Sequence, residues 1–399
     1  MAQRSGGEPK SWKYIPLAES GHEILSCSSD DQVKISGISL HALAGGRLLA
    51  AAAYSGPGVR KLHGAKGRQY RLNHWLQSRI LVSCDKGGQW KEKQDLPFTA
   101  PCLFRDGNSL YVAGHKGNLQ IARSADGGET WSGTSDLSSY DDNGGLFVQS
   151  PAGVLRTGRF IYLCFMRAED PRQKAAASPA YIPEILRAPC GADLLSAASW
   201  TRCRGIPAGD FFQNALYQEF TTLAQAVNPR APQPAAWGHP FLCKMDEAED
   251  GHETLLLLAQ SGGGNHATAA TVLSTAGNME IKPLTNAAGQ ITAAWPCPGG
   301  SRAFDLFHDE QTSLYWLTGF TPETKATQKL LLWKSHDLIN WEQAAWLLNS
   351  PADNFRCNMI RCTVRGNDLL LLALQSGCTP ETKVRTRLML HTLPAFREL

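Results

Sequence analysis

Short apolar runs recur along the chain, separated by clusters of glycine, asparagine, aspartate and proline. Each run has the length of a β-strand and is too short for an average helix. The runs are Leu48–Tyr54, Ser109–Ala113, Phe160–Met166, Glu253–Ala259, Ser313–Thr318, Lys329–Lys334 and Asp368–Leu374. Strand-length runs between turn-forming residues predict an all-β protein.

A short motif repeats at wide intervals. Ser83–Trp90 and Ser124–Trp131 both fit S-x-D-x-G-x-x-W, and a degenerate copy, Ser335–Trp341, keeps Ser, Asp and Trp but not Gly. The copies start 41 residues (124 − 83) and then 211 residues (335 − 124) apart, and the second offset is about five of the first. A period of about 40 residues is typical of four-stranded propeller blades. Weaker echoes near Arg187–Trp200 and Ser274–Ile281 are candidates for two intervening blades.

Turn chemistry explains the residue types in this motif. The Ser and Asp side chains can accept hydrogen bonds from turn amides, glycine allows positive φ, and Trp packs between neighbouring blades. We therefore assign the motif a structural role and no catalytic one.

The motif resembles the Asp box of the sialidase superfamily. Gly37–Ala53 with Arg79–Trp90 looks like the first blade of bacterial exo-sialidases, and Pro101–Trp131 looks like the second. Trp295–Trp341 is similar to late blades of divergent Asp-box proteins. The resemblance implies an all-β, six-bladed β-propeller with Asp-box turns and long inserted loops, formed by residues 1–399 as one domain.

The resemblance also implies an Arg triad for the sugar carboxylate, a Tyr nucleophile backed by Glu, and an Asp acid/base. Several of these are missing. Gly37-Ile38-Ser39 replaces Arg-Ile-Pro, and the loop Arg68–Trp75, which would hold the acid/base, has no acidic residue. Asp353–Asn358 lacks the expected Tyr, and Gln375 stands where a carboxylate is expected. The chain therefore resembles a divergent exo-sialidase with a non-standard catalytic set.

Three residues are the catalytic candidates. Asp353, in a polar loop, is the predicted acid or base, although an ordinary solvated turn is an equally good reading. Gln375 cannot transfer a proton, but its amide can hold a water in line for attack; the alternative is a rim hydrogen bond. His74 is an alternative proton carrier because imidazole titrates near neutral pH, and its alternative reading is a half-buried residue beside Trp75.

The substrate-binding candidates are arginines and two loop residues. Guanidinium groups match carboxylates bidentately, whereas most basic residues of any protein are simply solvated. The predicted set is Arg60, Arg71, Arg302, Arg356, Asn358 and Trp75, with Trp75 as an apolar wall for the sugar face.

Composition narrows the choice of partner. A net charge of +3 and a pI near 8.3 argue against nucleic acid. The 11 cysteines include no CxxC pair, so no zinc site is expected, and no motif implies a metal or organic cofactor. No run of 18 apolar residues occurs, and we expect no membrane insertion. We expect a cytoplasmic location if the sequence is complete, and an extracellular or periplasmic one if a signal peptide has been removed.

The sequence therefore predicts an exo-sialidase that releases terminal sialic acid from glycoconjugates such as mucin O-glycans. Its partner would be a sialylated glycan or another acidic-sugar substrate. Two alternatives stay open: a different exo-glycosidase or lyase on the same propeller, and a lectin-like propeller that binds glycans without cleaving them.

Overall fold

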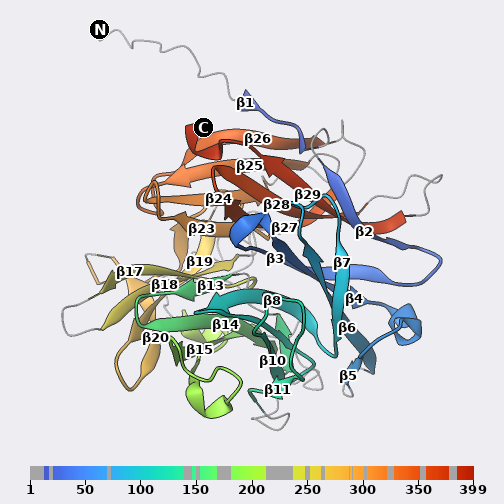
Figure 1. Ribbon diagram of the computed structural model, residues 1–399. Coiled ribbons are helices and arrows are strands. Elements are labelled where there is room, and N and C mark those ends of the chain that lie inside the picture. The colour runs from blue at the N-terminus through green and yellow to red at the C-terminus, as the bar shows by residue number, and fades with distance from the viewer. Residues whose placement is uncertain are drawn as a thin grey trace, which may run out of the picture.

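Six sheets surround a common centre and form a six-bladed β-propeller (Figure 1), which confirms the predicted fold class. The computed structural model describes residues 13–17, 21–69, 73–138, 146–149, 153–168, 181–212, 237–247, 252–261, 266–286, 288–289, 291–300, 303–320, 328–350, 356–376 and 384–399. All seven predicted strands are present, each within one or two residues of its expected bounds.

Blades 1 to 3 follow one another along the first half of the chain. Blade 1 contains β3 (Lys34–Ala42), β4 (Leu48–Ser55), β5 (Gly67–Gln69), β6 (His74–Ser83) and β7 (Lys91–Leu96), with the 3-10 turns η2 (Ala44–Gly46) and η3 (Pro57–Lys61). Blade 2 contains β8 (Thr99–Asp106), β9 (Ser109–His115), β10 (Leu119–Ser124) and β11 (Ser135–Asp136). Blade 3 contains β12 (Leu146–Gln149), β13 (Val154–Arg156), β14 (Phe160–Ala168), β15 (Tyr181–Pro189) and β16 (Thr201–Arg204), with η4 (Ala197–Ser199).

Blades 4 to 6 complete the ring. Blade 4 follows a short helix, α1 (Ala208–Phe211), and contains β17 (Phe241–Glu247), β18 (Glu253–Gln260), β19 (His266–Ser274), β20 (Met279–Thr285), β21 (Ile291–Thr292) and β22 (Ala294–Pro296). Blade 5 contains β23 (Asp305–Asp309), β24 (Leu314–Phe320), β25 (Gln328–Ser335) and β26 (Glu342–Ser350). Blade 6 contains β27 (Arg356–Arg365), β28 (Asp368–Ser376) and β29 (Val384–Leu393), followed by η5 (Phe396–Glu398). Within the described residues, no helix is long and apolar enough to cross a membrane.

The N-terminal segment closes the ring. β2 (His22–Ser28) pairs with β29 and becomes the outer strand of blade 6, so the last blade is built from both ends of the chain. β1 (Lys13–Tyr14) pairs in parallel with β26 on the outer edge of blade 5. A sheet built from both termini ties the first blade to the last, because the ring cannot open there without breaking a strand pair.

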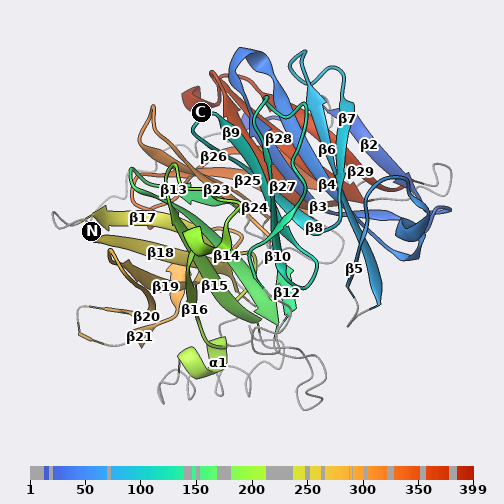
Figure 2. The ribbon, with the colours of Figure 1, turned by 60° about the horizontal axis from the view of Figure 1, so that its bottom comes forward.

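Six hydrophobic clusters of the described residues hold the blades together, and each lies between two neighbouring blades. Leu48, Ala50 and Ala52 of β4 pack toward blade 6, whereas Leu49 and Ala51 pack toward blade 2. Because both faces of a blade are covered, its strands are continuously apolar instead of alternating. Figure 2 shows the innermost strands β27, β3 and β8 side by side, and these three are in contact.

The repeated motifs form the turns between the third and fourth strands of blades 1, 2 and 5. In the first, Ser83 Oγ donates to Asp85 Oδ1 at 2.8 Å, Gly87 N donates to Ser83 Oγ at 2.8 Å, and Trp90 Nε1 donates to the Gly87 carbonyl at 3.0 Å. In the degenerate copy Leu338 replaces this glycine at φ 63°. The echoes at Arg187–Trp200 and Ser274–Ile281 contain the corresponding turns of blades 3 and 4, as predicted.

On the face that carries these turns, the third-to-fourth-strand turn of each of blades 1 to 5 is contacted by the preceding blade, and we call this face the box face. Blade 6 contacts blade 1 through Arg365, which donates to the Lys86 carbonyl. Blade 1 contacts blade 2 through Arg47, which donates to Glu129. Blade 5 contacts blade 6 through Asp309 and Arg397. The remaining contacts are the Gly191 amide to Asp106, Arg187 to Ser274, and the Trp295 indole to the Leu338 carbonyl.

The Asp309–Arg397 contact predicts a measurable stability effect. Arg397 Nε and Nη2 donate to the two Asp309 oxygens at 2.8 and 2.7 Å, and Asp309 is 5% exposed. We expect Arg397→Ala to lower the free energy of unfolding by about 3 kcal/mol, because a buried carboxylate loses its charged partner and keeps the Thr312 hydroxyl as a hydrogen-bond donor. Urea unfolding measures this loss. The matched control is Arg105→Ala, an exposed side chain bonded to the nearby Gly107 carbonyl, with an expected loss below about 0.5 kcal/mol. Equal losses would contradict a role for the pair in closure.

Candidate functional site

The face opposite the box face carries the strand ends that hold the predicted site residues, and we call it the loop face. Consecutive strands of a blade are antiparallel, so β27 and β6 begin, and β28 ends, on this face. All the predicted site residues that the structure describes therefore lie on the loop face. These are Arg60, His74, Trp75, Arg356, Asn358 and Gln375.

Three of these residues come together at the end of blade 6. Cys357 and Arg356 pair in register with Gln375 and Ser376, and Asn358 Nδ2 donates to Ser376 Oγ at 2.8 Å. Gln375 is 2% exposed, and its Oε1 accepts a hydrogen bond from Arg387 Nε at 2.9 Å. Arg356 and Asn358 are exposed.

His74 and Trp75 form a separate group at the start of β6. Both side chains are exposed, and the Arg68 guanidinium lies 5.8 Å from the centre of the Trp75 ring. Arg68 also donates to Asn73 Oδ1 at 2.6 Å. An exposed indole flanked by polar groups suits contact with a sugar face. Three further predicted residues, Asp353, Arg71 and Arg302, lie outside the described residues.

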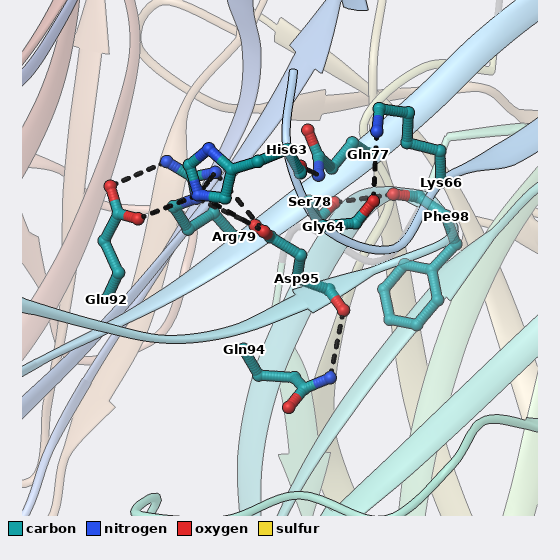
Figure 3. Close-up of polar contacts among 10 residues, drawn as sticks. All are labelled: His63, Gly64, Lys66, Gln77, Ser78, Arg79, Glu92, Gln94, Asp95 and Phe98. Atoms are coloured by element: carbon teal, nitrogen blue, oxygen red, sulfur yellow. Dashed lines mark hydrogen bonds and ion pairs between the residues drawn. The ribbon is translucent and has the colours of Figure 1, made fainter. Parts of the chain in front are cut away.

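Arg79 anchors the loop that carries Arg60 (Figure 3). Its guanidinium donates to Asp95 at 2.8 Å and Glu92 at 2.6 Å and lies 2.8 Å from the His63 ring. Arg79 is only 6% exposed, and these contacts occupy its nitrogen atoms. Arg79 thus holds the loop in place and is not itself a ligand-binding group.

A Tyr–Glu pair is present on the box face, opposite the described predicted site residues. The Tyr162 hydroxyl hydrogen-bonds Glu253 Oε2 and Ser274 Oγ, and Arg187 donates to the same Ser274. Tyr162 and Glu253 lie at the box-face ends of their strands and are buried. Burial first, and then Glu253, raises the pKa of Tyr162 above its ordinary value, which opposes a phenolate nucleophile. This network joins blades 3 and 4.

A second cluster lies at the axis of the propeller. Asp305 begins β23, Arg361 and Cys362 lie on β27, Cys102 lies on β8, and His239 precedes β17. Cys362 N donates to Asp305 Oδ2 at 2.6 Å, and Arg361 Nη1 lies 3.5 Å from Asp305 Oδ1. The Arg361 charge acts on both Cys102 and His239. The group joins the innermost strands of blades 2, 5 and 6 with the segment just before the innermost strand of blade 4. We call these five residues the axial cluster.

Burial sets the charges of the axial cluster. It raises the pKa of Asp305 to about 6, even though Arg361 and the Cys362 amide act in the opposite direction. Burial, followed by the Arg361 charge, lowers the pKa of His239 to about 4. Burial also raises the pKa of Cys102 to about 12 and holds the pKa of Cys362 well above its ordinary value. At neutral pH the cluster therefore contains a guanidinium, a carboxylate that is easily protonated, and neutral thiols and imidazole.

The axial cluster was missed by sequence reasoning. Asp305 and Arg361 are separated by 56 residues, and only the ring closure of blades 5 and 6 brings them together. A weak signal was available: Arg361 interrupts the apolar strand segment Met359–Val364 with a charge. Within the described residues, no group of three or more His, Cys, Asp or Glu residues could hold a metal ion.

Comparisons with known proteins match this fold. No protein-family model matches the chain, and no curated protein matches its sequence. The structure is similar to a Trypanosoma rangeli sialidase in complex with 2,3-difluorosialic acid, with a TM-score of 0.53 and 11% identity over 95% of this chain and 59% of that chain. It is also similar to a Penicillium chrysogenum alpha-L-arabinanase complexed with arabinobiose, with a TM-score of 0.48 and 13% identity over 95% and 99% of the two chains. The likeness to the T. rangeli protein shows that the two chains share the same kind of fold.

Asp305 predicts a pH dependence of stability. The pKa of Asp305 is about 6 in the folded chain, whereas the ordinary value of 3.8 applies to the unfolded chain. The native state therefore binds the proton more tightly than the unfolded state does. The stabilisation is complete at low pH and is lost as the pH rises through 6, by about 1.5 kcal/mol between pH 5 and 7.5. Asp305→Asn removes this dependence. Its unfolding free energy relative to wild type, measured by urea unfolding, should rise by that amount over the same range, and a constant difference would contradict the shift.

Proposed function

We propose that the protein is a glycoside hydrolase that releases a terminal acidic sugar, sialic acid, from glycoconjugates such as mucin O-glycans. The observation that carries this proposal is a guanidinium, Arg361, at the axis of a sialidase-like propeller. An acidic sugar needs a positive group where the ring of blades converges, and a planar fork suits a carboxylate. The T. rangeli sialidase, whose structure is named for its complex with a sialic acid derivative, has a fold of the same kind.

We assign the catalytic roles to the three residues predicted from the sequence. Asp353, between the end of β26 and the start of β27, would exchange the proton of the glycosidic oxygen. Gln375 Oε1 is held by Arg387, and its Nε2 makes no hydrogen bond to a described residue. That amide would orient the attacking water. His74 is the alternative proton carrier.

The proposed substrate contacts include residues of blades 1 and 6. Arg356 and Asn358 lie beside Gln375, and Arg387 joins them as a positive group that sequence reasoning did not select. Trp75 would pack against the sugar face. Arg60, Arg71 and Arg302 complete the proposed anion-binding set.

Release of free sialic acid from a sialylated O-glycan tests the proposal. We expect wild type to release the sugar and Asp353→Asn to lose at least about 100-fold in kcat, because general acid catalysis contributes that much. The matched control is Asp193→Asn, an exposed carboxylate in a box-face turn, with unchanged kcat. Thermal unfolding of both variants verifies the fold.

The outcomes separate the alternatives. Unchanged turnover in Asp353→Asn would remove this residue from the site. Absence of release across a panel of sialylated glycans, with binding retained, would favour the non-catalytic glycan-binding propeller. Release of a different terminal sugar would favour another exo-glycosidase or a lyase on this fold.

A further inference from the structure

Strand β23 carries two aspartates, each paired with an arginine from blade 6, and the two pairs differ. Asp309 accepts two hydrogen bonds from Arg397 at 2.7 and 2.8 Å, whereas Asp305 Oδ1 lies 3.5 Å from Arg361 Nη1. Arg397 holds the pKa of Asp309 below its ordinary value, while burial raises the pKa of Asp305. The first pair is a tight ion pair, and the second is a loose one.

The loose pair leaves part of the Arg361 fork uncommitted. Its Nη1 donates to the Ile360 carbonyl at 2.9 Å and toward Asp305, while Nε and Nη2 make no hydrogen bond to a described residue. The side chain is 11% exposed and is therefore not sealed from solvent. A planar guanidinium with two adjacent nitrogens available can bind a carboxylate bidentately.

Asp305 is the group of the axial cluster that changes charge between pH 5 and 7.5. From β27 it is faced by the Arg361 guanidinium and by the Cys362 thiol. From β8 it is faced by the Cys102 thiol, and His239 before β17 lies near Arg361. Burial keeps both thiols neutral, and it keeps His239 neutral above its pKa of about 4. Thr318 of β24, beside Cys362, carries no charge.

We propose that Arg361 binds the carboxylate of an acidic sugar in competition with Asp305, so that each bound ligand draws one proton onto Asp305. A ligand carboxylate and an ionised Asp305 at one buried guanidinium would repel each other, and protonation of Asp305 relieves this repulsion. The identity of the ligand as sialic acid rests on the proposed function. The coupling between carboxylate binding and proton uptake rests on the axial geometry and on the burial of Asp305.

Linkage fixes the size of the effect. One proton taken up on binding makes affinity fall by up to tenfold per pH unit above the pKa of the free group. With a pKa of about 6 for Asp305, affinity should fall about 20-fold between pH 5.5 and 7.5. Calorimetry in two buffers of different ionisation enthalpy counts the protons directly, so wild type alone provides a test.

The experiment titrates N-acetylneuraminic acid into the full chain by calorimetry at about pH 5.5, 6.5 and 7.5, values that lie on both sides of the Asp305 pKa of about 6. Wild type should lose affinity with rising pH, and its proton uptake per ligand should rise from about 0.2 at pH 5.5 to close to one at pH 7.5, because Asp305 in the free protein has a pKa of about 6. Asp305→Asn should bind with affinity independent of pH, and Arg361→Gln should lose at least about tenfold in affinity at pH 5.5.

The matched control is Asp309→Asn, which removes the other carboxylate of the same strand, on the box face. It should retain the wild-type pH dependence of binding. Thermal unfolding verifies each variant, and the wild-type proton count supports or overturns the proposal even where Asp305→Asn does not fold.

Wild-type affinity that is flat across the pH range, or unchanged affinity in Arg361→Gln, would overturn the proposal. Binding of glucuronic acid but not N-acetylneuraminic acid, with the same proton uptake, would support the axial coupling and contradict the sialic acid assignment. If neither sugar acid binds, the axial proposal is wrong. Release of sialic acid by wild type would then still support the proposed function, with its anion-binding group elsewhere on the loop face.

Discussion

The ring depends on a contact repeated around the box face, where the third-to-fourth-strand turn of each of blades 1 to 5 is held by the preceding blade. Neighbouring blades share apolar cores, but a hydrophobic core is non-directional and does not by itself fix the angle between two sheets. Hydrogen bonds to the backbone of a turn can fix this angle, because they form only within a small range of distances and angles. Arg365 and Arg47 make the same kind of contact from equivalent turns of blades 6 and 1, although no sequence motif marks them.

In the blades that lack the motif, other side chains make the contacts at the position of this turn. Ser274 ends the third strand of blade 4, as Ser83 does in blade 1, but its partners are Tyr162 and Arg187 instead of an Asp. Blade 6 has no such turn between consecutive strands, because its outer strand comes from the N-terminus, and Arg397 fills the position. The Tyr–Glu pair is thereby accounted for by closure.

The features that could be predicted from the sequence are those that depend on contacts between residues close together in the chain. Asp85 and Asp126 organise their turns within five residues, so the motif could be recognised without knowing the fold, and its spacing gave the blades. The degenerate copy shows the limit of pattern matching, since Leu338 adopts the positive φ that glycine would supply and the turn survives. Arg361 and Asp305 were not predicted because their meeting depends on how strands of different blades align. Sequence spacing does not contain that information.

Two Asp–Arg pairs on one strand show how position on the propeller decides what a carboxylate does. Asp309 lies at the box-face end of β23, where Arg397 reaches it with two nitrogens and fixes its charge. Asp305, four residues earlier, lies among innermost strands, where Arg361 divides its donors between a backbone carbonyl and a distant oxygen. Incomplete pairing in a desolvated site leaves the pKa of Asp305 near neutrality and the guanidinium able to take another anion. An Asp–Arg pair therefore closes the ring at the box-face end of β23, where both carboxylate oxygens are bonded. At the other end the pairing is incomplete, which makes a weak structural contact but leaves the two groups in the state that a binding site requires.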